Sequence, residues 1–271
     1  MNSVLLDPMF RMPFLTGFAF SLSLPILGMY LRLREEWLAA LAFAQLAAAG
    51  SLGAAIVGLP FQFGAVAAAA AGALAKSLLA HTGNNGYAAM MIFGWALAIL
   101  LLANVPVAEH LAHALFDGQL YFTSTSHLAA AGGYLVLGGA LLILLSRALL
   151  LERMLPGFFA ASGRSGRRYH VAFDLLAAAG LALATSSIGV MAAFGLVFVP
   201  SMIAYRLGKN WMSSLILAAG VGAISYLFAF AAALELDQPF GPVLVLILVA
   251  AAGIAQAIPA HRGAHPSPAA R

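Results

Sequence analysis

The sequence predicts an all-α bundle of about eight to nine membrane-spanning segments, from three observations. Hydrophobic residues make up 63% of the 271 residues and charged residues only 8%, whereas a soluble domain is about half apolar and about a quarter charged. The apolar residues form long runs, most of them close to the roughly 20 residues that cross about 30 Å of hydrocarbon. The basic residues fall in short loops between these runs. A chain with so few charges cannot cover a soluble surface, so its solvent must include lipid.

Nine apolar stretches form the predicted spans. The first, 14–31, is expected in the mature protein, because the start of the chain lacks a basic n-region followed by a small-residue cleavage site. The stretch 194–207 is too short to cross alone and is expected to be a broken or tilted segment. The other stretches lie at about 38–58, 61–80, 87–106, 128–150, 171–192, 211–234 and 241–259.

Alanine and glycine fill many of these stretches, as in the run 67–75. Small residues let helix backbones approach closely in lipid, where packing holds helices together. The sequence therefore predicts a compact bundle, although a general alanine bias is an alternative explanation for part of the enrichment. Residues 1–260 are expected to form the transmembrane domain.

The charges predict an orientation for this bundle. If the N-terminus lies outside and each stretch crosses the membrane, every Lys and Arg except Arg11 lies on the cytoplasmic side. The acidic residues outside are then Asp7, Glu109, Asp117, Glu235 and Asp237. The positive-inside rule thus predicts an outer N-terminus, a cytoplasmic C-terminus and a disordered cytoplasmic tail over 261–271, in the plasma (inner) membrane. Negative outer loops concentrate cations, unless the acids only avoid the basic side.

Two loops are longer than turns, and loops of this size are usually functional. The outer loop runs over about 106–126, and the inner loop over about 151–170. The inner loop is basic and contains the amphiphilic piece PGFFAASG. We expect a short helix there that docks on a soluble partner; the alternative is a helix held on the membrane surface by anionic lipid. Asp174 follows this loop and is expected to pair with Arg167, Arg168 or that partner, while Lys76 snorkels to the interface.

Motifs for soluble chemistry are missing from the sequence, which has no Walker A loop, HExxH, GxSxG or GxGxxG. Cysteine is absent, which excludes disulfides and thiolate chemistry. We therefore expect a transport subunit rather than an enzyme, with no cofactor in this chain. If ATP drives transport, ATP and Mg must bind on a separate ATPase chain. The pI of about 9.7 follows from the loop charges, so nucleic acid is not an expected partner.

Three stretches together resemble one family of membrane proteins. The stretch 185–210 has a glycine, a small and apolar run, a proline, and then alanine and arginine, at Gly189, Pro200, Ala204 and Arg206. Further on, LDQPFGPVLVL matches an Asp-x-Pro-x-Gly-Pro motif at Asp237, Pro239, Gly241 and Pro242. LFDGQL at 115–120 resembles a Leu-Phe-Gly element. In order and spacing, these residues resemble the zinc/manganese/iron family of ABC-transporter permeases (ABC-3).

The resemblance implies a type II ABC importer permease fold and a set of partners. Two permease copies, identical or related, would form a pathway in membrane lipid. Two cytoplasmic ABC ATPases would drive it, and an extracytoplasmic solute-binding protein would deliver the cargo. The implied function is import of a divalent metal ion (zinc, manganese or iron) by ATP-driven alternating access. The family's coupling helix, which docks on the ATPase, corresponds here to Phe158, Phe159, Ala161 and Gly163.

One departure from the family concerns the cargo. After the first span the family usually has an aspartate and, four residues later, a histidine, which face the pathway; here these positions are Leu41 and Gln45. Leucine cannot ligate a cation, and an amide oxygen is a weak ligand. Either the ligands lie elsewhere, or the cargo is a chelated metal or another small solute. Gln45 is predicted to contact the pathway, with an interhelical hydrogen bond as the alternative. A secondary carrier is disfavoured, since acidic residues are missing from mid-span positions.

The outer mouth is the other candidate site. Glu109, His110, His113 and Asp117 share one face if the outer loop is helical, and His110 and His113 are candidate metal ligands. The alternatives are a solvated loop, or a gate that contacts the binding protein. Asp237 is assigned to the same mouth, although a role in the turn before Pro239 is also expected.

Overall fold

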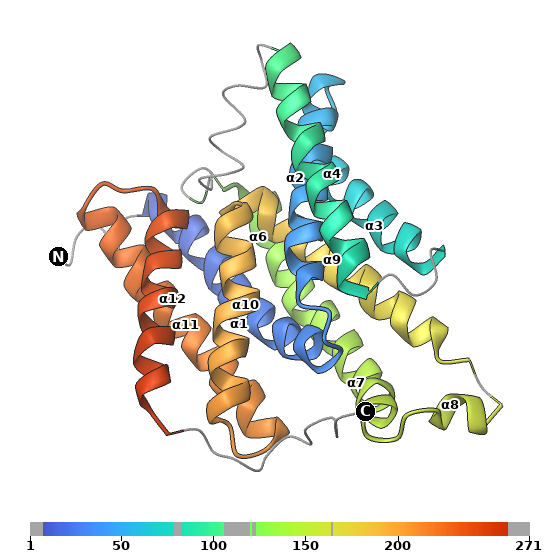
Figure 1. The fold of residues 1–271 in the computed structure, drawn as a ribbon. Helices are drawn as coiled ribbons and strands as arrows, with labels where there is room; N and C mark the ends of the chain where they lie inside the picture. The colour runs from blue at the N-terminus through green and yellow to red at the C-terminus, as the bar shows by residue number, and fades with distance from the viewer. Residues whose placement is uncertain (1–7, 79–82, 106–119, 121–122, 164, 260–271) are drawn as a thin grey trace.

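The fold is a bundle of helices, seen in a computed structural model that describes residues 8–78, 83–105, 120, 123–163 and 165–259 (Figure 1). The described residues contain helices and no strand. The elements are α1 (Pro8–Leu33), α2 (Leu38–Ile56), α3 (Phe61–Leu78), α4 (Gly83–Asn104), α6 (Thr125–Gly133), η2 (Tyr134–Gly138), α7 (Gly139–Met154), α8 (Phe158–Ala161), α9 (Arg167–Ile188), α10 (Val190–Leu207), α11 (Trp211–Glu235) and α12 (Phe240–Ala257).

The prediction of about eight to nine spans is confirmed. Within the described residues, nine helices are long and apolar enough to cross a membrane, with α6, η2 and α7 forming one continuous helix over Thr125–Met154. The expectation for 194–207 is wrong, because α10 begins at Val190 and is long enough to cross by itself. Gly189 ends α9 with φ 86° and ψ 163°, a conformation essentially restricted to glycine. This break lies inside an apolar run, so hydropathy alone misplaced it.

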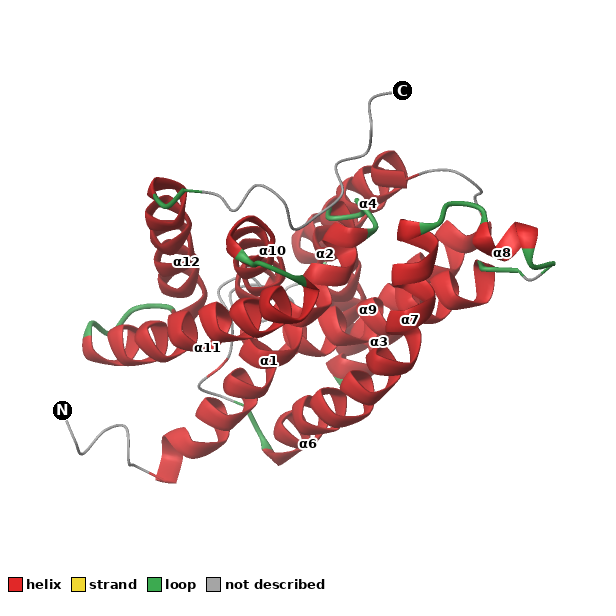
Figure 2. Cartoon of the chain, turned by 90° about the horizontal axis from the view of Figure 1, so that it is seen from below, coloured by secondary structure: helices red, strands yellow, loops and turns green. Residues whose placement is uncertain are grey.

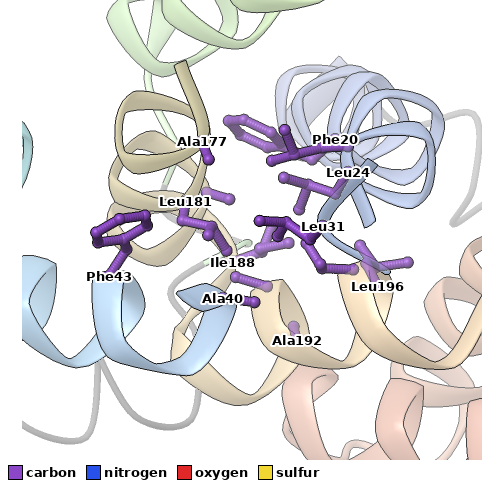
Figure 3. Packing of buried hydrophobic residues seen from close by; sticks show 14 of the residues in the cluster. Phe20, Leu24, Leu31, Ala40, Phe43, Ala177, Leu181, Ile188, Ala192 and Leu196 are labelled. Atoms are coloured by element: carbon purple, nitrogen blue, oxygen red, sulfur yellow. The ribbon is translucent and has the colours of Figure 1, made fainter. Parts of the chain in front are cut away.

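Four helices form the centre of the bundle. The membrane windows of α1, α2, α9 and α10 are mostly buried, whereas those of α3, α4, α11 and α12 leave most of their residues at the surface. Figure 3 shows apolar side chains of the four central helices packed together, among them Phe20, Leu24, Phe43, Leu181, Ile188 and Leu196. The peripheral helices expose large apolar side chains such as Phe93 and Ile143, as expected of a surface in contact with lipid.

Glycine lets several of these helices touch backbone to backbone. A Cβ atom added at Gly28 of α1 would collide with the carbonyl oxygen of Val197 on α10. Gly50 of α2 and Gly64 of α3 face one another, and a Cβ on either would collide with the carbonyl oxygen of the other. This agrees with the expectation that small residues make the bundle compact.

The turns between helices lie at two ends of the bundle (Figure 1). We call one end the basic end: it holds the C-termini of α1, α3, α7 and α10, the N-terminus of α9 and the whole of α8. Arg34, Lys76, Arg153 and Arg167 lie there and contact residues of neighbouring elements. Figure 2, viewed from below Figure 1, shows α8 at the margin of the bundle beside α7 and α9.

Candidate functional site: a pathway stripe and a buried ion-pair ring

Leu41 and Gln45 lie one turn apart on α2 and therefore share a face of that helix. We call these two residues the pathway stripe. Leu41 is partly buried and packs against Ala44, Ala48 and Val190. Gln45 has only 9% of its surface exposed. The two residues that the resemblance assigns to the family's aspartate and histidine positions therefore lie next to each other on α2.

Gln45 keeps a buried polar atom without a partner. Its Oε1 atom accepts no hydrogen bond from any described residue, although a buried amide is normally satisfied. On one side, α4 passes so close that a Cβ on Gly94 would lie 2.9 Å from the Gln45 carbonyl carbon. The amide oxygen therefore does not provide an interhelical hydrogen bond among the described residues, and it remains free to bind a donor or a cation.

The outer-mouth residues Glu109, His110, His113 and Asp117 lie outside the described residues, so their roles stay predictions. Among the described residues, no group of three or more His, Asp or Glu side chains could hold a metal ion. Asp237 is exposed in the turn between α11 and α12 and has φ 50°. Aspartate tolerates this left-handed conformation better than most residues, which supports its expected role in the turn.

The remaining family-motif residues shape and close helices. Ala204 is fully buried on α10, and Pro200 is buried within the same helix. Arg206 donates hydrogen bonds from Nη2 to the carbonyl oxygens of Gln256 (2.9 Å) and Ile258 (3.0 Å), at the C-terminal end of α12. A cation there satisfies carbonyls that have no partner within the helix. Pro239 precedes α12, and Gly241 is buried in its first turn.

The expected short helix of the inner loop is α8, and its two phenylalanines point in different directions. Phe159 is 9% exposed and stacks on Tyr169 of α9, with ring centroids 5.3 Å apart. Phe158 is 39% exposed. Ala161 is exposed, and Gly163 follows the helix with φ 65°. Phe158 is therefore available to a partner, whereas Phe159 attaches α8 to the bundle.

Sequence reasoning missed a closed ring of ion pairs at the basic end. We call Arg34, Glu36, Lys76 and Asp174 the ion-pair ring. Arg34 contacts Asp174 Oδ1 and Glu36 Oε2, each at 2.8 Å. Lys76 Nζ contacts Asp174 Oδ2 at 2.8 Å and Glu36 Oε1 at 2.9 Å. Each carboxylate oxygen thus has a basic partner, and the four side chains are only 3–16% exposed.

An aromatic side chain lies beside each cation of the ion-pair ring. The Arg34 guanidinium lies 4.9 Å from the centre of the Phe173 ring, and Lys76 Nζ lies 5.1 Å from that of Tyr87. Tyr87 also donates a hydrogen bond to Glu36 Oε2 at 3.4 Å. Such cation–π contacts strengthen when water is excluded. The expectation that Asp174 pairs with Arg167 or Arg168 is wrong, because both its oxygens are occupied by Arg34 and Lys76.

A cavity of about 810 Å³ lies next to the ring. Its wall combines ring residues with residues of the inner loop and the start of α9, among them Lys76, Asp174, Phe159, Gly166 and His170. Glu152 Oε2 of α7 lies 2.6 Å from His170 Nε2, and Arg153 forms an ion pair with Glu35 at 2.6 Å. The basic end therefore links α7, α8 and α9 with the turn that precedes α2.

These features define a class of protein. Within the described residues, nine helices are long and apolar enough to cross a membrane, so the fold is that of a multi-pass membrane protein. The model of the ABC 3 transport family matches residues 7–258. The chain belongs to that family, and it is the permease of an ABC transport system.

The fold is similar to that of a solved chain of "PsaBC from Streptococcus pneumoniae in complex with Fab". The TM-score is 0.81 at 18% sequence identity, over 93% of this chain and 92% of that one. At this identity the likeness concerns the fold alone. None of the curated proteins compared with the chain matches it.

Proposed function

We propose that this permease belongs to a binding-protein-dependent ABC importer whose cargo is a divalent metal ion, namely zinc, manganese or iron. Membership of the ABC 3 transport family supports the importer. The observation that supports a role in the transport pathway concerns Gln45 of the central helix α2. Its buried Oε1 atom has no hydrogen-bond partner among the described residues. It occupies the position that contacts cargo in the permeases which the sequence resembles. A polar group kept unsatisfied at this depth is a functional-site hypothesis by default.

The proposal assigns a side of the membrane to each end of the bundle. The basic end faces the cytoplasm, in accordance with the positive-inside rule. There α8, with exposed Phe158, meets an ABC ATPase that binds ATP and Mg. The opposite end, with the loop 106–126, receives the solute-binding protein. A second permease copy, identical or related, completes the pathway, and the N-terminus lies outside.

Transport then follows from alternating access. ATP binding closes the two ATPases and moves the 151–170 segments of both permeases. These movements open the pathway between the two copies, so that cargo released by the binding protein passes the pathway stripe. Gln45 supplies an amide oxygen that replaces one water of a partly hydrated cation. Leu41 offers no second ligand atom, so the contact with the cation stays weak. Weak contacts favour passage of the cation over its retention.

Leu41 also supports a second candidate, in which the cargo is a chelated metal. A bare divalent transition-metal ion favours imidazole or carboxylate ligands, and the described part of α2 offers neither near Gln45. A chelate carries its ligands with it, and its polar rim could bond to a neutral amide. This candidate shares the fold, the partners and the energy source of the first.

The test is ATPase stimulation in proteoliposomes that contain the permease, its ATPase and its binding protein. Stimulation by binding protein loaded with Zn²⁺, Mn²⁺ or Fe²⁺ supports the first candidate. Stimulation by a metal–chelate complex alone selects the second. If the permease associates with no ATPase, both candidates are wrong. The variant L41D/Q45H restores the family's ligand pair and should strengthen the response to free metal, whereas L41N, a matched polar control, should not.

A further inference from the structure

We propose that the ion-pair ring, through Asp174, carries the movement of α8 to the pathway stripe on α2. Asp174 is thus a positioning residue for transport. This inference rests on the proposed function, because it needs an ATPase that moves α8. The contacts form a continuous series from α8 to α9, from α9 to the ring, and from the ring to α2.

The first contact joins α8 to the start of α9. Phe159 stacks on Tyr169, and a Cβ on Gly166 would lie 3.0 Å from the Phe159 ring. Glu152, on the other side of α8 in the chain, has its Oε2 atom 2.6 Å from His170 Nε2. The end of α7, α8 and the first turn of α9 are therefore held together. A displacement of α8 must displace the N-terminus of α9.

The second contact runs along α9 itself. Asp174 lies seven residues after Arg167, where α9 begins, which is two helical turns or about 10 Å. A helix of this length moves as one body. Because Asp174 binds Arg34 with one oxygen and Lys76 with the other, it cannot shift without displacing the ends of both α1 and α3.

The third contact reaches α2. Arg34 and Lys76 both bind Glu36, which lies two residues before Leu38, the first residue of α2. Leu41 and Gln45 follow within the first two turns of that helix. The same short turn is also attached to α7, through the pair between Glu35 and Arg153. That second pair is exposed and therefore weak, so it is not part of the link.

Burial explains why charges suit this role better than apolar contacts. A buried charge pulled from its partner remains unpaired in a medium of low dielectric constant, which adds a large electrostatic cost to that of disrupted packing. A closed ring therefore moves together or breaks at one step. This stiffness makes the ring a link, and it distinguishes the ring from the exposed pair of Glu35 and Arg153.

Removal of one charge tests the link in the reconstituted importer. D174N retains the shape of the side chain but weakens its bonds to Arg34 and Lys76. We expect D174N to assemble with the ATPase, to keep basal ATPase activity and to lose at least tenfold in both cargo-stimulated ATPase activity and uptake. D174E should restore part of both. E35Q, which breaks the exposed pair in the same turn, is the matched control and should transport like the wild type.

A second variant covers the case in which D174N fails to fold. K76Q/D174N removes one charge of each sign and leaves the Arg34–Glu36 pair in place, so no buried charge is left unpaired. It should assemble and show the same loss of stimulated activity. Wild-type transport by either assembled variant overturns the link. If the wild-type permease itself lacks ATPase stimulation, the proposed function fails instead, so the two failures are distinguishable.

Fluorescent labels at single positions distinguish a link between α8 and α2 from a purely structural role of Asp174. The chain has no cysteine, so S162C beside α8 and V57C at the end of α2, both exposed positions, each accept one fluorophore in separate preparations. In an otherwise wild-type importer, trapping with ATP and vanadate should change the signal of both labels. In D174N only the label at position 162 should respond. A response of both labels, or of neither in an assembled complex, contradicts the link.

Discussion

The ion-pair ring and the pathway stripe differ in whether their polar side-chain atoms have partners. In the ring every carboxylate oxygen has a basic partner, and both cations also face an aromatic ring. In the stripe, Leu41 offers no polar atom and the amide oxygen of Gln45 has no described partner. The two regions are less than two helical turns apart in the chain, since the ring residue Glu36 precedes Leu41 by five positions.

This contrast shows where buried charges are compensated in the permease. Paired charges are placed where helices must keep a fixed relation to one another, and they are fully compensated there. The stripe holds Leu41 and Gln45 where the family resemblance leads us to expect an aspartate and a histidine, so under the proposed function cargo would meet a nearly apolar surface with a single acceptor. We therefore expect each region to respond to mutation in its own way, because mutations in the ring leave buried charges unpaired whereas mutations in the stripe change the proposed contact with cargo.

The largest expected effect comes from breaking the ring without compensation. R34A leaves Asp174 and Glu36 each short of one partner at buried positions. Removing one member of a buried pair costs about 3–5 kcal/mol. Unfolding of the purified permease in detergent, followed by tryptophan fluorescence, should show a loss of this size. An R34A protein as stable as the wild type would show that the ring is not structural.

The next effect comes from charging the stripe. L41D places a carboxylate beside Gln45 in the first turn of a membrane-spanning helix, where it costs less than the about 2.5–3.5 kcal/mol of a helix centre. We expect a loss of stability below this range in the same unfolding assay, and partial recovery when Zn²⁺ or Mn²⁺ is added. L41N is the control, and its stability should not depend on metal. Equal metal responses of the two variants would contradict a pathway position for Leu41.

A smaller effect of opposite sign is expected for Q45L. Leaving a buried polar atom unsatisfied costs about 1–3 kcal/mol, so its replacement by leucine should stabilise the fold by up to that amount. Cargo-stimulated ATPase activity should nevertheless fall, because the pathway then has no polar atom in the stripe. Unfolding and ATPase measurements on one preparation test the expected gain in stability and the expected loss of stimulated activity together. Loss of stability in Q45L would indicate that the amide forms a stabilising interhelical hydrogen bond.

The smallest effect belongs to the exposed pair at the basic end. Glu35 has 62% of its side chain exposed and pairs with Arg153. Exposed pairs contribute about 0–1 kcal/mol, so E35Q should unfold within 1 kcal/mol of the wild type. High salt should reduce even this difference. A loss comparable to that of R34A would mean that burial does not set the strength of pairing in this region.

Features that depend on neighbouring residues were predictable from the sequence. The order of the spans and the short helix at Phe158–Ala161 follow from apolar run length and local amphiphilicity. The boundary at Gly189 was not predictable from hydropathy, because the break lies in a long apolar stretch in which the nearby polar residues are only the hydroxyl side chains of Thr185, Ser186 and Ser187. The family's motif contained this glycine, but only its φ angle reveals its purpose.

The candidate site was predicted in part. Resemblance to a family identified Leu41 and Gln45, yet the unpartnered state of the amide depends on how α4 and α10 pack around α2. The ring could not be predicted, because Asp174 is 140 residues from Arg34 and 98 from Lys76. Its members look like ordinary loop charges in the sequence. Basic residues close to Asp174 in the chain, such as Arg167, bond elsewhere, to the carbonyl oxygen of Ser77.

The same separation has a consequence for biosynthesis. Ribosomes add about 5–20 residues per second, so the 98 positions between Lys76 and Asp174 correspond to about 5–20 s of translation. During that interval only one of the two carboxylates of the ring, that of Glu36, has been synthesised to balance Arg34 and Lys76. Insertion of α9 supplies the missing negative charge. A chain interrupted before α9 retains a surplus cation there, which distinguishes an unfinished permease from a completed one.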